Sequence, residues 1–193
     1  YTGDAGTQEI KLSYSGGIVG QATETSCVIK NCVVSGRVRS KQWGGGIVGW
    51  LQGGSVTDCN ALSGTVVETN SITGGIAGYL GNGGKAENNS IVLTSSVSAT
   101  ERAVGGILGR LASGTVKGNT AYTTITGNAP YKGTIIGEVT GMTRNISDNL
   151  YNQNNGAEHV IGYDAMSFAF SDEGGSVGDP STTPTTPTTP TTP

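Results

Sequence analysis

The stretch that decides the fold is residues 45–49, which read Gly-Gly-Ile-Val-Gly. Near copies of this glycine box stand at residues 16–20, 74–78 and 105–109, and a weaker copy, Gly-Thr-Ile-Ile-Gly, stands at residues 133–137. The central isoleucines of the five boxes are Ile18, Ile47, Ile76, Ile107 and Ile135. They are about 29 residues apart, and a fixed period of this size is typical of repeat proteins, in which each repeat is one structural unit.

Each box is followed by a second recurring half, in which a small residue and Val precede a Cys or an Asn. In the second copy this half runs over residues 54–59 and ends at Cys59, and residues 63–66 then read Ser-Gly-Thr-Val. In the first copy Cys32 and the Ser-Gly-Arg-Val of residues 35–38 hold the same places. The repeat is therefore longer than its glycine box.

The box, the G-x-V-x-x-C segment and the S-G-x-V segment together resemble the GLUG repeat of large bacterial surface proteins. The resemblance covers roughly residues 16–150. It implies an extracellular region of several repeats, as found in adhesins and in the non-catalytic parts of surface proteases. The family has no fixed catalytic residues to transfer to this chain.

Physical chemistry alone predicts an all-β fold, a parallel β-solenoid (β-helix) of five to six rungs of about 29 residues. One rung cannot bury its apolar side alone, so stacked rungs make the core, and we expect the five box isoleucines to stack within it. The 33 glycines among 193 residues fit sharp corners beside short strands. An antiparallel sandwich or a propeller is the competing fold.

We expect the solenoid to occupy residues 1–172, with repeats starting near residues 16, 45, 74, 105 and 133. Residues 9–14 alternate apolar and polar side chains and predict a strand. Residues 165–170 alternate in side-chain bulk, and they predict either a strand that caps the last rung or one that pairs with a neighbouring molecule.

Residues 173–193 are rich in glycine and then in Thr-Pro repeats, and they predict an extended linker or tail. Threonine beside proline is a usual substrate for O-glycosylation. The candidate acceptors are Thr182, Thr183, Thr185, Thr186, Thr188, Thr189, Thr191 and Thr192.

Composition and charge exclude several functional classes. The net charge of −3 argues against nucleic-acid binding, and no apolar stretch is long enough to span a membrane. Charge is nevertheless uneven, because residues 1–144 hold 11 basic and 8 acidic side chains, whereas residues 145–193 hold no basic and 6 acidic ones. Such an asymmetry favours attraction between molecules, although it also fits a solvated surface.

The sequence predicts no catalytic, cofactor or metal site. His159 is the only histidine, and the motifs of hydrolases and nucleotide-binding enzymes are missing. Five acids are scattered along the repeats without forming a close pair, which argues against carbohydrate hydrolysis. They are Asp58, Glu68, Glu87, Glu101 and Glu138.

The three cysteines leave several states open. Cys32 and Cys59 hold equivalent places in successive repeats, so stacking would bring them within reach of a disulfide. A Cys27–Cys32 bond is the alternative, and buried free thiols are a third.

Two further groups of residues are candidates for surface roles. Trp50 and Tyr79 directly follow two consecutive boxes, where they would form a sugar-binding face or simply pack against each other. Asn88 and Asn145 begin Asn-x-Ser sequons and are candidate N-glycosylation sites.

Taken together, these features predict a non-catalytic extracellular structural protein. It would be a subunit of a fibre or stalk on a bacterial cell surface, associating with itself or with neighbouring domains of a larger protein. A glycan-binding surface module is the first alternative, and a carbohydrate-active β-helix enzyme is the second.

Overall fold

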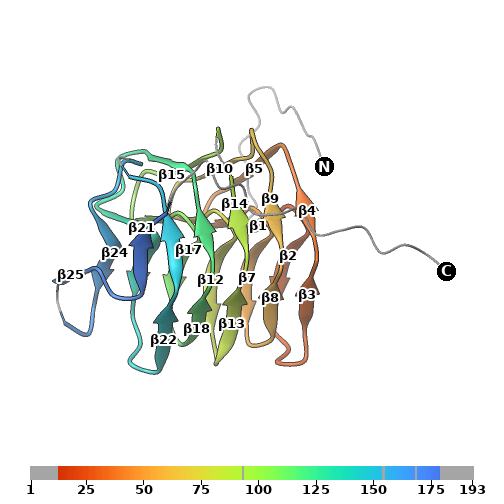
Figure 1. Ribbon diagram of the computed structural model, residues 1–193. Helices are drawn as coiled ribbons and strands as arrows, with labels where there is room; N and C mark the ends of the chain where they lie inside the picture. The colour runs from red at the N-terminus through yellow and green to blue at the C-terminus, as the bar shows by residue number, and fades with distance from the viewer. Residues whose placement is uncertain (1–12, 93, 154, 168, 179–193) are drawn as a thin grey trace.

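The computed structural model describes residues 13–178, apart from residues 93, 154 and 168 (Figure 1). It is all-β over this part of the chain, and its strands stack into a parallel β-solenoid of about six turns, as the repeat predicts. Each turn of the chain is one rung, and successive rungs lie side by side along the axis.

The strands follow one another in the same order in every rung. The first rung contains β1 (Tyr14–Gly16), β2 (Val19–Ala22), β3 (Val28–Lys30) and β4 (Val33–Val34). The second contains β5 (Arg37–Ser40), β6 (Trp43–Gly45), β7 (Val48–Gln52), β8 (Ser55–Thr57) and β9 (Asn60–Ala61). The third contains β10 (Val66–Thr69), β11 (Ile72–Gly74), β12 (Ala77–Gly81), β13 (Gly84–Glu87) and β14 (Ser90–Ile91).

The remaining rungs repeat this order with small changes. The fourth contains β15 (Ser96–Ala99), β16 (Ala103–Gly105), β17 (Leu108–Leu111), β18 (Gly114–Lys117) and β19 (Thr120–Ala121). The fifth contains β20 (Thr124–Thr126), β21 (Tyr131–Val139), β22 (Arg144–Ser147) and β23 (Asn149–Tyr151). The sixth contains β24 (His159–Asp164), β25 (Ala169–Ser171) and β26 (Gly175–Val177).

These strands pair into four sheets whose neighbours come from successive rungs. The largest has 11 strands, and the others run β20-β15-β10-β5, β22-β18-β13-β8-β3 and β26-β23-β19-β14-β9-β4. Val67 pairs in parallel with Val38 on one side and with Val97 on the other, which is a shift of one repeat in each direction. This register rules out the antiparallel sandwich and the propeller.

The core is built from columns of side chains that occupy equivalent positions in successive rungs. The backbone N–H of each box isoleucine donates to the carbonyl of the next one, at 3.0 Å from Ile18 to Ile47 and 2.9 Å from Ile76 to Ile107. Ile47, Ile76, Ile107 and Ile135 are fully buried, as expected. The expectation is wrong for Ile18, which is 48% exposed because its column ends there and no described rung covers it.

The glycine boxes fold the 11-stranded sheet back on itself. Trp43 precedes one box and Trp50 follows it, yet their ring centroids are only 4.8 Å apart. The strands before the boxes thus face the strands after them. A Cβ on Gly49, the last residue of its box, would lie 2.6 Å from the backbone nitrogen of Ser15 in the facing strand. The two half-sheets therefore touch backbone to backbone, and only glycine fits at this position.

A second corner recurs between the five-stranded and six-stranded sheets. One residue in each of the first five rungs lies there in the left-handed region, with φ between 54° and 65°, a conformation that Asn, Asp and Gly tolerate best. These corner residues are Asn31, Asp58, Asn88, Gly118 and Asp148.

One of the four sheets is capped at the C-terminal end of the solenoid. Strand β25 pairs antiparallel with β24, as a capping strand would, and β26 pairs with β23. Val160 and Ile161 in the last rung are buried as a result. Residues 175–177, which follow the expected boundary at residue 172, also belong to a sheet of the solenoid.

The N-terminal end is open within the part of the chain that the structure describes. Strands β1 to β5 each stand at the edge of their sheet. The strand expected at residues 9–14 falls mostly outside the described residues, as do the Thr-Pro repeats of residues 181–193.

Candidate functional site

The open N-terminal end exposes apolar side chains. At the equivalent positions of the interior rungs, the side chain is either buried or polar. Ile18 is 48% exposed, Val33 is 48% exposed and Val28 is 68% exposed. Val33 pairs with Asn60, and Val28 pairs with Ser55, so the inner rungs have polar residues at these two positions. Apolar surface gathered at an unpaired sheet edge marks a contact site.

The two ends of the solenoid carry opposite charge. Residues 13–41 contain four basic side chains and one acidic one, a balance of +3. Residues 145–178 contain five acidic side chains and no basic one, a balance of −5 with His159 neutral. The asymmetry seen along the sequence therefore becomes an axial separation of charge in the folded protein.

Several of these charges also pair between neighbouring rungs. Nε of Arg39 lies 2.7 Å from Oε2 of Glu68, and Nζ of Lys30 lies 3.5 Å from Oδ2 of Asp58. Within the sixth rung, Nδ1 of His159 lies 3.4 Å from Oδ1 of Asp172. Exposed pairs of this kind contribute little stability, so their main effect is on the surface potential.

One acid, Glu138, is buried and held by two arginines. Arg102 donates to both carboxylate oxygens at 2.8 and 3.0 Å, and Nε of Arg110 donates to Oε2 at 2.8 Å. Burial alone would raise the pKa of Glu138, but the hydrogen bonds from Arg102 and Arg110 outweigh it and hold this pKa below its usual range. The arrangement is that of a structural ion cluster.

Asp164, in the last rung, has the same character. Arg144 binds its two oxygens at 3.1 and 2.6 Å, and Oδ1 also accepts the backbone N–H of Met166 at 2.9 Å. Burial would raise the pKa of Asp164, yet these contacts lower it. This pair fastens β24 to β22 near the C-terminal end of the solenoid.

Replacing Glu138 with glutamine is expected to lower the free energy of unfolding by about 2 kcal/mol at pH 7, because two arginines lose their buried counter-charge. A carboxylate with a lowered pKa stabilises the fold above its unfolded pKa, and this stability is lost as the pH falls through the folded value. The difference between wild type and E138Q, measured by urea unfolding, should therefore shrink below about pH 4. A difference that stays constant from pH 7 to pH 3 would contradict this role.

A polar ladder runs through the core beside the second corner. Asn89, Asn119 and Asn149 occupy the same position in successive rungs and are buried. Oδ1 of Asn119 accepts both the backbone N–H and the side-chain amide of Asn89 at 3.0 Å, and Oδ1 of Asn149 does the same for Asn119. Each amide also donates to a backbone carbonyl, such as that of Ala86 at 2.9 Å.

Cys32 and Cys59 occupy the first two positions of this ladder. Cys59 is fully buried and its backbone N–H donates to Oδ1 of Asn89 at 3.0 Å. The predicted equivalence of the two cysteines is confirmed by the register, in which the next residues, Val33 and Asn60, are paired. All three cysteines are free thiols in the structure.

The aromatic residues form a packed stack along the fold of the 11-stranded sheet. The rings of Trp50 and Tyr79 lie face to face, with centroids 3.7 Å apart and planes at 6°. Trp43 meets both rings edge-on, and Arg110 lies 5.2 Å above the Trp43 ring. Burial raises the pKa of Tyr79, and this effect outweighs the nearby positive charge of Arg110, which lowers it. Since Trp50 and Tyr79 turn one face each toward the other, the arrangement favours lateral packing over sugar binding.

The other predicted residues are spread over the surface. Asn88 and Asn145 are exposed, although Asn89 and Ser90 of the first sequon are buried. The eight candidate threonines lie outside the described residues. No group of three metal-ligating side chains and no helix able to span a membrane occurs among residues 13–178 as described.

The asparagine ladder and the ion clusters were not predicted from the sequence. Aligning the repeats at the second corner reveals an Asn, Asp or Gly followed by Cys or Asn in each of the first five rungs, at residues 31–32, 58–59, 88–89, 118–119 and 148–149. That pattern could have revealed the ladder. Nothing in the sequence brings Arg102 to Glu138, which is 36 residues away.

Comparison with known proteins supports a GLUG-repeat protein. Residues 12–39 match the family model of the GLUG motif. The match covers the first glycine box with its second half, and the later boxes repeat the same pattern. No curated protein and no solved structure matches the chain.

Proposed function

We propose that the chain is a non-catalytic, extracellular structural protein, a subunit of a fibre or stalk on a bacterial surface, and that subunits join end to end. The observation that carries the proposal is the N-terminal end, which is open in the part of the chain that the structure describes. There the buried isoleucine column stops at a half-exposed Ile18, at the edges of strands β1 to β5. A further subunit would cover this surface.

The opposite end of a second copy is the partner that fits best. It exposes apolar side chains too, since Val177 is 49% exposed and Met166 is 44% exposed. Its balance of −5 complements the +3 of the open end. Strands β25 and β26 also stand at sheet edges there, so backbone hydrogen bonds are available on both sides of the contact.

A contact between two different ends has a geometric consequence. It is heterologous, so repeating it produces an open filament unless the rotation between subunits closes a ring. A solenoid that adds rungs along its axis suits a stalk, because every added subunit increases the length without changing the cross-section.

Three of the five acids weighed for carbohydrate hydrolysis are paired with basic residues. Asp58 pairs with Lys30, Glu68 with Arg39, and Glu138 with Arg102 and Arg110. A glycosidase needs two carboxyl groups that flank a substrate. Pairing with basic residues supports a structural role for these three acids.

The proposal predicts concentration-dependent association that salt weakens. Sedimentation velocity should show the chain growing into oligomers as its concentration rises, and electron microscopy should show filaments one solenoid wide. Raising the salt from about 0.05 M to 0.5 M should reduce association, because charges at the two ends are screened.

The matched variants are Val33→Glu at the open end and Leu62→Glu on the side of the solenoid, where Leu62 is 40% exposed. V33E should weaken association at least about tenfold, because it places a negative charge against the acidic end of the next subunit. L62E should associate like the wild type. A chain that stays monomeric at every concentration and salt would overturn end-to-end assembly.

A further inference from the structure

The polar ladder changes chemistry at the open end of the solenoid. Its three C-terminal positions are carboxamides, which connect each rung to the next through two hydrogen bonds. Its two N-terminal positions are the thiols of Cys32 and Cys59. There the corresponding contact is the backbone N–H of Cys32 donating to Sγ of Cys59 at 3.4 Å. A thiol is a weak donor and acceptor, so these contacts hold the first rung less firmly.

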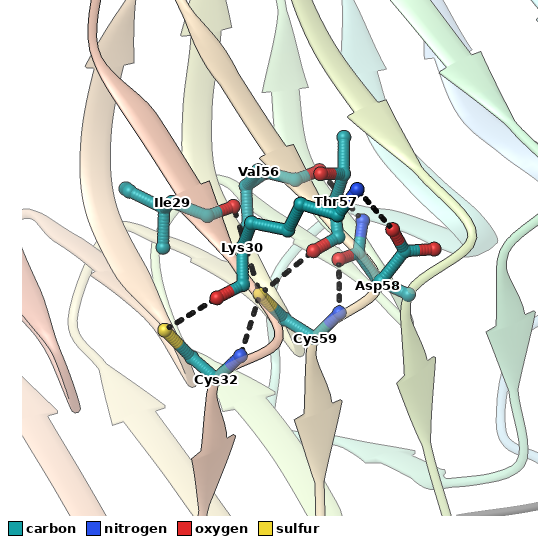
Figure 2. A network of polar contacts seen from close by, with 8 residues as sticks. Ile29, Lys30, Cys32, Val56, Thr57, Asp58 and Cys59 are labelled. Atoms are coloured by element: carbon teal, nitrogen blue, oxygen red, sulfur yellow. Dashed lines mark hydrogen bonds and ion pairs between the residues drawn. The ribbon is translucent and has the colours of Figure 1, made fainter. Parts of the chain in front are cut away.

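The Cys59 thiol points toward the first rung. Figure 2 shows its sulfur between the two rungs, beside the backbone nitrogen of Cys32. It lies 3.8 Å from the carbonyl oxygen of Ile29 in the first rung and 3.2 Å from that of Thr57 in its own rung. Sγ of Cys32 lies 3.5 Å from the carbonyl oxygen of Lys30, the equivalent of the Thr57 contact.

The backbone places these two cysteines within disulfide range. Adjacent parallel strands are about 4.8 Å apart, and disulfides need Cα atoms about 4.4–6.8 Å apart. The carbonyl of Cys32 also accepts the N–H of Asn60 at 2.8 Å, which fixes the two rungs in register directly beside the pair.

The alternative pair, Cys27 and Cys32, lies at opposite ends of one extended strand. Strand β3 (Val28–Lys30) separates them, and an extended chain rises about 3.3 Å per residue, so their Cα atoms are too far apart. On the neighbouring rung Cys27 faces Gly54, whose Cβ would lie 2.3 Å from the carbonyl oxygen of Cys27. The fold thus selects one pair from the alternatives that the sequence leaves open.

We propose that Cys32 and Cys59 are an oxidation site, at which a low-molecular-weight disulfide such as oxidised glutathione converts the two thiols into a disulfide that fastens the open rung to the second rung. The inference does not depend on end-to-end assembly, because both cysteines belong to one chain.

The reaction is thiol–disulfide exchange in two steps. The thiolate of Cys32, which is only partly buried, attacks one sulfur of oxidised glutathione and releases one glutathione thiolate. The Cys59 thiol then loses its proton, attacks Sγ of Cys32 in the mixed disulfide and releases the second glutathione. Two protein thiols are oxidised and one glutathione disulfide is reduced to two thiols.

The order of the two steps follows from burial. Burial raises the pKa of Cys59 to about 11, so this thiol is protonated at neutral pH and is shielded from a bulky oxidant. Cys32 stands at the open end and is reached first. Cys59 then reacts within the chain, where its partner is held in place by the ladder.

Tryptic mapping of the intact wild-type chain tests the pairing, because trypsin separates the three cysteines. Cleavage after Lys30, Arg37, Lys41 and Lys85 leaves Cys32 in residues 31–37 and Cys59 in residues 42–85, while Cys27 stays in the peptide that ends at Lys30. After incubation with oxidised glutathione at pH 8, we expect residues 31–37 linked to residues 42–85. Linkage of Cys27 instead, or a glutathione adduct on Cys32 that never resolves, would overturn the proposal.

Thermal unfolding of the same preparations supplies the second readout. The oxidised chain should unfold at least about 5 °C above the reduced chain, because the bond closes a loop of about 28 residues in the unfolded state. Cys27→Ser should keep both the crosslink and the shift, whereas Cys32→Ser should lose both. Equal unfolding midpoints for the oxidised and reduced wild type would show that the bond does not fasten the rung.

Discussion

Replacing Gly78 with alanine is expected to lower the free energy of unfolding by about 3 kcal/mol or more. Gly78 is the last residue of the third glycine box. Its Cβ would lie 2.5 Å from the carbonyl oxygen of Gly49 and 3.0 Å from the backbone nitrogen of Gly44. Those atoms belong to strands, so they cannot move aside as a flexible side chain would, and the two half-sheets must separate.

The first box supplies a matched control. Gly20 is the equivalent glycine of the first rung, but a Cβ there would meet only the carbonyl oxygen of Tyr14, at 3.3 Å, because no described rung lies beyond it. Gly20→Ala should therefore change the stability by less than about 1 kcal/mol. Urea unfolding monitored by tryptophan fluorescence measures both variants, since Trp43 and Trp50 lie in the affected fold of the sheet.

The contrast between the two variants decides what the glycine box is for. If the box served only to provide flexible corners, Gly20→Ala and Gly78→Ala would have similar effects. Equal losses of stability would therefore contradict backbone-to-backbone packing of the half-sheets, whatever the absolute values.

The second large effect is expected for Asn119→Leu, which should cost about 3 kcal/mol. Leucine branches at the same carbon as asparagine but removes all four side-chain hydrogen bonds of Asn119. The backbone N–H of Asn89 then has no acceptor in the core, and burying an unsatisfied polar group costs about 1–3 kcal/mol. Chemical unfolding should show a lower midpoint with an unchanged slope.

Asn145→Leu is the matched control for the ladder variant. Asn145 lies on β22, which pairs with β18 of the rung that contains Asn119, but its side chain is exposed. Its replacement should change the stability by less than about 0.5 kcal/mol.

The loss of stability in Asn119→Cys should fall between those of Asn119→Leu and Asn145→Leu, because a thiol at the equivalent position of the second rung, Cys59, accepts the ladder N–H of Cys32. A full loss of stability in the cysteine variant would show that thiols do not replace amides in this ladder.

The sequence predicts the fold of this protein well because its evidence is periodic. The repeat spacing places Ile47 beside Ile76, and the equivalent places of Cys32 and Cys59 in the repeat motif put these two side by side. A parallel solenoid joins residues one period apart, so contacts distant along the sequence are still predictable from the repeat. The last strand is harder to place, because β26 lies in a glycine-rich segment that departs from the period.

The candidate site is less predictable, since it depends on where the repetition stops. Ile18 has the same box sequence around it as Ile47, yet one is half-exposed and the other is fully buried. The difference lies in the neighbouring rung and not in the residue. The two arginines that hold Glu138 differ in this respect. Arg110 stands one period away and pairs with Glu138 in register, whereas Arg102 is 36 residues away and follows no repeat position, so the period could not indicate it.

By itself, the sequence determined the period, the all-β class and the equivalence of positions between rungs, because these follow from the spacing of glycine and β-branched residues. Only the tertiary structure decided that the boxes fold a sheet onto itself and that Cys59 points toward Cys32. It also decided that the two ends of the solenoid differ in charge and in whether a capping strand is present. The physical reason is that burial, backbone approach and electrostatic potential depend on which atoms lie across from a residue. A repeat defines its neighbours along the stack but not the surface at which the stack ends.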